Sequence, residues 1–167
     1  MPTPIVLLAL LQGAVIHSPP DPRGWHHYAN GRYAYSICTP PGFAPQPEAE
    51  NGDGREFLAR DGARLAVWGS NLLEELGPFS AMLRANERDD VSKGARITYH
   101  AAGATWGVSS GIRGSQAFYR KSLLRPDRSG DQVMTFELSY PRSRDALYRP
   151  IAERLSRCFT IARHAPF

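Results

Sequence analysis

The sequence lacks an apolar run that could span a membrane, a recognisable metal-ligand spacing and an internal repeat. Its longest uncharged apolar stretch covers residues 5–16, whereas a membrane-spanning helix needs about 20 such residues. The five histidines are His17, His26, His27, His100 and His164. None stands in an H-x-x-x-H spacing, and adjacent histidines on a strand point to opposite faces. The sequence therefore predicts no metal, no cofactor and no transmembrane span in the mature protein.

Cysteine is also scarce. The chain has two, Cys38 and Cys158, one near each end of the expected domain. An even number of cysteines in an exported protein indicates a disulfide, so we expect a bond between Cys38 and Cys158. Two unrelated buried thiols are the alternative, since free cysteine packs as a small hydrophobic residue.

The composition fits one ordinary globular domain. The chain has 167 residues, of which 42% are hydrophobic and 22% are charged, enough to bury a sizeable core. Residues 1–83 carry a net charge of −3 and residues 84–167 a net charge of +7. This asymmetry indicates either a basic face for an anionic partner or a solvated surface, which we favour. The basic stretches match no nucleic-acid-binding motif, and no nucleic-acid partner is expected.

The N-terminal stretch has the pattern of an export signal. Residues 5–16 read IVLLALLQGAVI and are followed by the polar, proline-rich HSPPDPRG. That length fits the hydrophobic region of a signal peptide, although no basic residue precedes it and no A-x-A cleavage site follows it. A buried strand or helix of the fold is the alternative. We expect a signal peptide over residues 1–18, a linker over 19–24, one domain over 25–163, and a periplasmic or secreted protein.

The domain reads as pairs of strands, a helix, a run of strands and a last helix. Helices are expected from Pro78, with a cap at Gly94, and from Ser143, where Pro150 either kinks the helix or begins a new one. Asp-Gly at 61–62 predicts a hairpin. Strands are expected at 25–30, 33–39, 55–60, 63–70, 95–102, 105–112, 115–125, 132–140 and 159–162. Runs of strands with few helices between them predict an α+β fold with an antiparallel sheet.

Several short patterns resemble those of the PsbP-like fold group. They are Y-x-YSI at 33–37 followed by two prolines, FYRK at 118–121, FELSYP at 136–141, and PIAERL at 150–155 followed by Phe159. The group includes the extrinsic subunit P of photosystem II and short bacterial exported proteins. The resemblance implies a single antiparallel sheet of about six strands with helices on both faces, and a binding or scaffolding role. It assigns no functional residue to this chain.

One catalytic motif is matched literally. Residues 107–111 read GVSSG, the G-x-S-x-G pattern that places a nucleophilic serine on a strand-to-helix turn. Residues 112–124 continue as strand and turn without a helical pattern, and the only later histidine is His164. We therefore reject this motif and assign no catalytic, cofactor-binding or metal-binding residue.

We expect the acidic pairs and the tryptophans to have structural and not functional roles. Adjacent residues of a helix point about 100° apart, so the pairs at 74–75 and 89–90 are predicted to be solvated charge and not catalytic carboxylates. We expect Trp25, Trp68 and Trp106 to belong to the core. A cluster of tryptophans at a sheet edge would instead indicate a ligand platform.

The sequence as a whole favours a non-catalytic binding or accessory protein of the bacterial cell envelope, with an unknown protein or small-molecule partner. The alternative is a small hydrolase that uses Ser109 or Ser110 with His100. These two hypotheses differ in geometry, because a hydrolase needs the serine and the histidine within reach of each other.

Overall fold

The computed structural model describes residues 24–127 and 130–161. The expected signal peptide at 1–18 lies outside these residues, as do His17 and His164. The two α-helices are α1 (Phe79–Ser92) and α2 (Asp145–Cys158), each preceded by a short 3-10 turn, at Glu74–Leu76 and Arg142–Arg144. In this part of the chain no helix is long and apolar enough to cross a membrane.

The strands form two antiparallel sheets. The larger sheet contains, in spatial order, β3 (Phe43–Pro45), β4 (Gly54–Ala59), β5 (Arg64–Asn71), β9 (Gln132–Pro141), β8 (Gln116–Arg125), β7 (Trp106–Arg113) and β6 (Ala95–Ala102). The smaller sheet contains β1 (His26–Asn30), β2 (Tyr35–Thr39) and β10 (Thr160–Ile161), with β2 in the middle. The α+β class and the antiparallel pairing agree with the sequence, and the hairpin at 61–62 joins β4 to β5.

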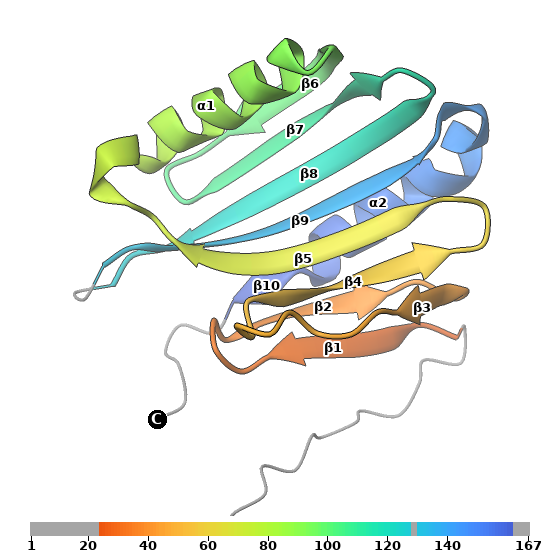
Figure 1. Ribbon diagram of the computed structural model, residues 1–167, viewed down its shortest axis with the longest axis horizontal. Coiled ribbons are helices and arrows are strands. Elements are labelled where there is room, and N and C mark those ends of the chain that lie inside the picture. Colours follow the sequence, from red (N-terminus) through yellow and green to blue (C-terminus); the bar gives the residue numbers. More distant parts are fainter. Residues whose placement is uncertain (1–23, 128–129, 162–167) are drawn as a thin grey trace, which may run out of the picture.

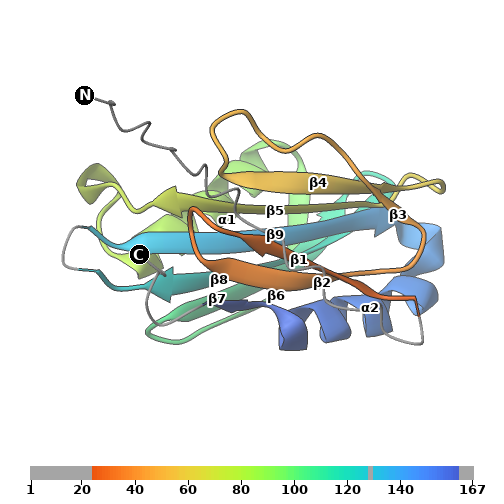
Figure 2. The same ribbon diagram turned by 90° about the horizontal axis from the view of Figure 1, so that it is seen from below.

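The expectation of a single sheet of about six strands was wrong. The chain leaves the smaller sheet after β2, where Pro40 and Pro41 have no backbone N–H to donate to a ladder. Phe43 then begins the larger sheet beside β4. β1 and β2 therefore form a separate layer with β10, as Figures 1 and 2 show.

The two helices lie on opposite faces of the larger sheet, as expected. Figure 1 shows α1 in front of the β6–β7 end of the sheet and α2 behind it. Met134, Phe136 and Leu138 on β9 are fully buried against α2 and the smaller sheet. Val133, on the other side of β9, is buried against Phe79 of α1. We call the two sides the α2 face and the α1 face; the main apolar core is on the α2 face.

The ends of α1 follow the sequence signals. Pro78 precedes the first helical residue, and Gly94 follows the helix with a φ of +86°, a conformation that favours glycine. Phe79 and Met82 bury the first turns against the sheet. The predicted limits of this helix are therefore confirmed.

The second helix runs through Pro150 without a break. The spacing of Leu147, Ile151 and Leu155 predicts one apolar side of this helix. Leu155 is buried as predicted, but Leu147 is 49% exposed and the other buried residues are Tyr148 and Ala152. The aromatic ring of Tyr148 fills the core position that the spacing predicts for Leu147. Tyr148 stacks on Tyr140 with ring centroids 4.8 Å apart.

The β4–β5 turn is bonded to the second helix through one aspartate. The Tyr148 hydroxyl donates to Asp61 at 2.8 Å and Arg144 donates to the same carboxylate at 2.7 Å. Burial alone would raise the pKa of Asp61, but these bonds and the backbone N–H of Ala63 outweigh it and hold the pKa below its usual value. Burial, with the bond to Asp61, raises the pKa of Tyr148 to about 12. Asp61 therefore fixes the turn to α2 as an ionised carboxylate at neutral pH.

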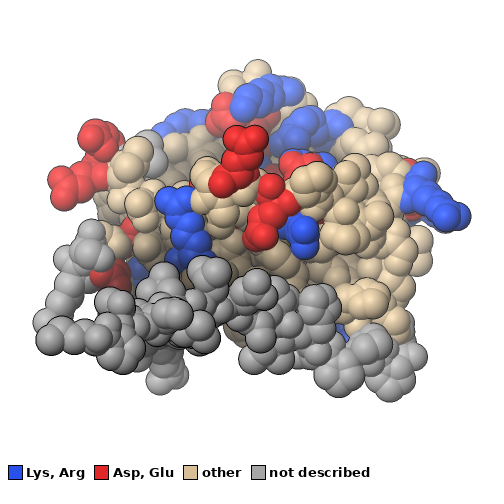
Figure 3. Space-filling view, turned by 60° about the horizontal axis from the view of Figure 1, so that its bottom comes forward, with Lys and Arg blue, Asp and Glu red and all other residues tan. Residues whose placement is uncertain are grey.

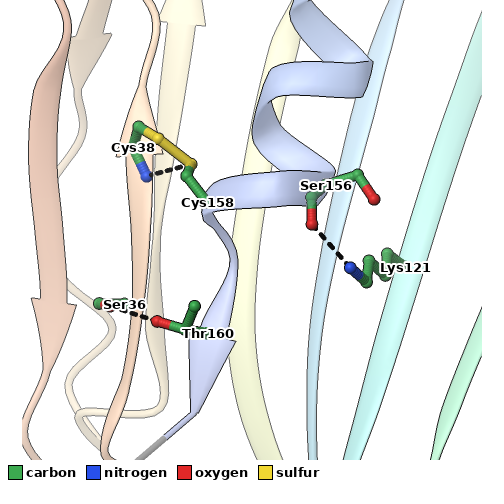
Figure 4. Close-up of a disulfide and its surroundings, with 6 residues drawn as sticks. All are labelled: Ser36, Cys38, Lys121, Ser156, Cys158 and Thr160. Atoms are coloured by element: carbon green, nitrogen blue, oxygen red, sulfur yellow. Dashed lines mark hydrogen bonds between the residues drawn. A yellow bond between two sulfur atoms is a disulfide. The ribbon is translucent and has the colours of Figure 1, made fainter.

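A disulfide joins Cys38 of β2 to Cys158 at the end of α2, with Cα atoms 6.0 Å apart (Figure 4). Two further contacts support the same junction. The hydroxyls of Ser36 and Thr160 are 3.0 Å apart, and Lys121 of β8 donates to the carbonyl of Ser156 at 2.6 Å. The smaller sheet, α2 and β8 are thus joined at one place.

Reduction of this disulfide should destabilise the domain strongly. The bond links residues 120 positions apart, and closing so long a loop lowers the entropy of the unfolded chain. In the chain-entropy model the oxidised protein is more stable by about 4–5 kcal/mol. Urea unfolding with and without reductant measures this difference, with Cys38→Ser/Cys158→Ser as the control that reductant should leave unchanged. Equal midpoints for oxidised and reduced wild type would contradict the pairing.

Candidate binding site

The α1 face of the sheet is polar where the α2 face is apolar. One row of cross-strand partners runs over this face from β4 to β6, through Glu56, Ala66, Glu137, Arg120, Ser109 and His100. α1 covers the β6–β8 end of the row. The β4–β5 end has no helix over it.

A charged cluster fills the space between α1 and the sheet. Asp90 of α1 accepts hydrogen bonds from Arg120 at 2.7 and 3.2 Å and from Arg113 at 2.6 Å. Arg120 also donates to Glu137, with its Nε 2.9 Å from Oε2. Both guanidinium groups lie near the ring of Phe118, at 5.1 Å for Arg113 and 5.7 Å for Arg120. Two carboxylates and two guanidinium groups therefore balance one another in this cluster.

This cluster corrects the interpretation of the acidic pair at 89–90. The Asp90 side chain is 4% exposed, so it is a buried charge and not a solvated one. Asp89 does match the expectation, because it is exposed and pairs with Lys93 at 2.6 Å. Burial acts to lower the pKa of Arg120, but the bonds to Asp90 and the charge of Glu137 outweigh it and raise the pKa. Arg120 is therefore charged and holds α1 to β8 and β9.

A shallow cavity of about 610 Å³ lies over the uncovered β4–β5 end of the same face. β4, β5 and Glu137 of β9 line one side, and the loop at residues 46–53 lines the other. Hydrogen bonds hold that loop in place: Asn30 donates to the carbonyl of Gly52 at 2.8 Å, and Tyr35 donates to that of Asp53 at 3.0 Å. The cavity is therefore bounded by fixed backbone on both sides.

The carboxylates around this cavity have arginine partners. Glu56 accepts a hydrogen bond from Arg64 across the β4–β5 ladder, and Asp53 lies 3.0 Å from Arg32. The hydrogen bond from Arg64 holds the pKa of Glu56 below its usual value, against the opposing effect of burial. Glu137 bonds to Arg120 through one oxygen only. Among the described residues no hydrogen bond reaches its Oε1, and Arg113 is 4.0 Å from that atom. The two glutamates that line the cavity thus keep unused acceptor capacity.

The structure brings Ser109 and His100 together and separates them from Ser110. Ser109 and His100 are cross-strand partners on the α1 face, whereas Ser110 points to the α2 face. His100 Nδ1 is 3.1 Å from Glu87 of α1, and all three line a cavity of about 110 Å³. Within the described residues no hydrogen bond joins Ser109 to His100. Ser109 also lies inside β7, between β6 and β8, where the ladders occupy the backbone N–H groups that an oxyanion hole would need.

The GVSSG motif lies in the middle of β7, and the chain continues as strand to Arg113. The strand-to-helix turn of a nucleophile elbow is therefore missing at this place, as the sequence indicated. The tryptophans do not gather at one sheet edge: Trp25 precedes β1, Trp68 lies on the α1 face of β5, and Trp106 begins β7. No set of three His, Cys, Asp or Glu side chains in residues 24–127 and 130–161 is placed to hold a metal.

Charges of both signs are interspersed on the side of the molecule shown in Figure 3. Most of the arginines near α2 have an acidic neighbour, such as Arg144 with Asp61 and Arg149 with Asp145. The excess of basic residues in the second half of the sequence is thus spread through ion pairs, which fits the interpretation of a solvated surface.

Several solved structures have a similar arrangement of sheets and helices. Cyanobacterial PsbP (CyanoP) from Synechocystis sp. PCC 6803 superposes with a TM-score of 0.60 and 17% identity, over 93% of this chain and 99% of that chain. The domain has a PsbP-like fold. LpqN, involved in cell envelope biogenesis of Mycobacterium tuberculosis, matches with a TM-score of 0.57 and 14% identity, over 85% of this chain and 86% of that one.

The PsbP-like fold also includes the Saccharomyces cerevisiae Ran-binding protein Mog1p, which matches with a TM-score of 0.54 and 10% identity over 82% of this chain and 95% of that chain. No protein-family profile matches the chain, and no curated protein matches it significantly in sequence. These similarities establish the fold alone, because one fold can carry many different functional sites.

Removing the buried charge of Asp90 should destabilise the domain far more than removing its neighbour. Asp90→Asn leaves Arg113 and Arg120 to share the single carboxylate of Glu137, and loss of one partner of a buried ion pair costs about 3–5 kcal/mol. Asp89→Asn is the matched control one position away, and loss of its exposed contact costs about 0.5 kcal/mol or less. Urea unfolding of the two variants measures the difference. A similar small effect of both variants would show that the cluster does not hold α1.

Proposed function

We propose that this protein is an exported, non-catalytic binding or accessory protein of the bacterial cell envelope. The observation that carries the proposal is the division of the α1 face. Its charged groups under α1 are bonded to one another through Arg120, while the cavity over β4 and β5 is lined by hydrogen-bonding groups with unused capacity. Such a surface supplies recognition and no activated group.

Three further observations support export to the envelope. A disulfide fits an oxidising compartment, because thiols are kept reduced in the cytosol. Residues 5–16 have the length of a signal-peptide hydrophobic region. LpqN, which shares the fold, is a protein of envelope biogenesis. We therefore assign the protein to the periplasm or the exterior.

A hydrolase remains the second candidate, because Ser109, His100 and Glu87 share one small cavity and Glu87 contacts His100. The position of Ser109 within β7 weighs against it. A serine whose neighbouring N–H groups are engaged in ladders has no donor pair for a developing oxyanion.

Fractionation of cells that express the full chain with a C-terminal tag tests the proposal. We expect the protein in the envelope fraction with its cysteines oxidised, and chemical cross-linking there should give a specific adduct. Glu56→Arg should weaken the adduct because it opposes Arg64 at the cavity. Glu74→Arg is the matched charge reversal on the 3-10 turn before α1 and should leave the adduct unchanged.

Two results would contradict the proposal. One is a wild-type protein that remains in the cytoplasm with free thiols. The other is an adduct that forms equally with the Glu56 and Glu74 variants, which would place recognition elsewhere on the molecule.

A further inference from the structure

The cavity over β4 and β5 is lined by one aromatic side chain, Trp68, and by the small side chain of Ala66 beside it. Trp68 projects from the α1 face of β5, and its cross-strand partners are Gly54 on β4 and Thr135 on β9. Glycine is required at 54, since a Cβ there would come within 2.0 Å of the carbonyl oxygen of Val67. Neither neighbour has a side chain large enough to cover the indole. Part of the ring therefore remains available to a ligand.

The floor beside Trp68 is small and flanked by carboxylates. Glu56, Ala66 and Glu137 are cross-strand partners on β4, β5 and β9. Strands two apart in a sheet are separated by about 9–10 Å. The methyl group of Ala66 thus lies between two carboxylates and lines the cavity, with the residue as a whole 5% exposed. Ala66 and Trp68 are two positions apart on the same strand and share its α1 face.

The balance of charge decides which class of ligand fits. Every carboxylate that lines the cavity has an arginine partner, as with Glu56 and Arg64. The other lining cation, Arg55, donates to the carbonyl of Gln46 at 2.8 Å, so the charges at the site nearly cancel. Its hydrogen-bonding capacity is nevertheless only partly used. Arg64 has five N–H donors, and Glu56 accepts from one of its NH2 groups. Glu137 keeps one oxygen without a hydrogen bond among the described residues, 4.0 Å from Arg113. A ligand with many neutral donors and acceptors on an apolar ring matches this combination of an aromatic face and a few placed polar groups.

We propose that this cavity binds a neutral sugar unit of an envelope glycan, with the ring against Trp68 and its hydroxyls bonded to Glu56, Arg64 and Glu137. The inference rests on the proposed binding function and names the ligand of that site. The C–H face of the sugar contacts the indole, its hydroxyls donate to the carboxylates, and its oxygens accept from Arg64. The general acid of a glycoside hydrolase is a carboxyl group with a raised pKa, whereas the hydrogen bond from Arg64 lowers the pKa of Glu56. Glu56 is therefore a hydrogen-bond acceptor for the sugar and not a general acid.

Nuclear magnetic resonance titration of the isotope-labelled chain with two uncharged probes, tetra-N-acetylchitotetraose and maltotetraose, tests the proposal. We expect saturable shifts of the Trp68 indole N–H and of the β4 and β5 amides with at least one probe. Trp68→Ala should weaken binding by about tenfold or more, the equivalent of one lost aromatic contact. Trp68→Phe should restore part of it. Trp106→Ala is the matched control on β7 and should leave the affinity unchanged.

A second variant protects the test against misfolding of the tryptophan variant. Glu56→Ala removes one proposed hydroxyl partner at a side chain that is 47% exposed. It should weaken the shifts severalfold while the thermal unfolding midpoint stays close to that of wild type, because an exposed ion pair contributes little to stability. Absence of saturable shifts with both neutral probes overturns the inference. Preferential binding of oligolysine or polygalacturonate at β4 and β5 overturns it as well, because the site would then select charge.

Failure of the sugar proposal can be distinguished from failure of the proposed function. An exported, cross-linkable protein that binds neither neutral probe would keep its accessory role and lose the sugar ligand. A protein that binds the sugar but remains reduced in the cytoplasm would lose the proposed location.

Discussion

Arg120 is the side chain on which the arrangement of the α1 face depends. It lies between Asp90 of α1 and Glu137 of β9, with both carboxylates at least nine-tenths buried. A buried guanidinium is tolerated only where its donors are bonded and its charge is balanced. The bidentate contact to Asp90 therefore fixes where the end of α1 sits on the sheet, and the contact to Glu137 fixes one carboxylate at the inner end of the cavity. Arg120 thus connects the half of this face that α1 covers to the half that contains the cavity.

The opposite face is held by apolar packing. β9 separates the two, because its alternate residues enter the apolar core on one side and the charged cluster on the other. The smaller sheet and α2 cover the apolar side and are joined to each other at Cys38 and Cys158. This division leaves much of the α1 face free to carry polar groups, since the larger apolar cluster is on the other side and only a smaller one packs under α1.

Much of the fold could be predicted from the sequence. The strands from Ala95 to Pro141, the β4–β5 hairpin and the limits of α1 follow from alternation, Asp-Gly and flanking Pro and Gly, which are local signals. The separation of β1 and β2 into a second sheet could not be predicted, because the choice of sheet depends on contacts distant in the chain. The burial of Tyr148 in place of Leu147 could not be predicted for the same reason, because Tyr148 contacts Asp61 and Tyr140 only in the folded protein.

The candidate site was the part that sequence reasoning missed. Asp90 looked like one half of a solvated acidic pair, and its burial depends on Arg113 and Arg120, which lie 23 and 30 residues away. A signal was present in β8 and β9, where Arg120 and Glu137 carry opposite charges at positions that face the same way. Charged residues at inward positions of two central strands indicate a buried ion pair. The cavity beside them had no sequence signal, because it depends on where α1 lies across the sheet and not on a motif.

Native-state hydrogen exchange of the wild-type protein tests most directly whether the charged cluster unites α1 with the sheet. The account predicts that amides in the last turns of α1, around Asp90, open with nearly the same free energy as those of β8 and β9, because Arg120 joins all three elements. If α1 instead exchanges through openings far less costly than those of β8 and β9, the helix is held independently of Arg120 and the account is wrong.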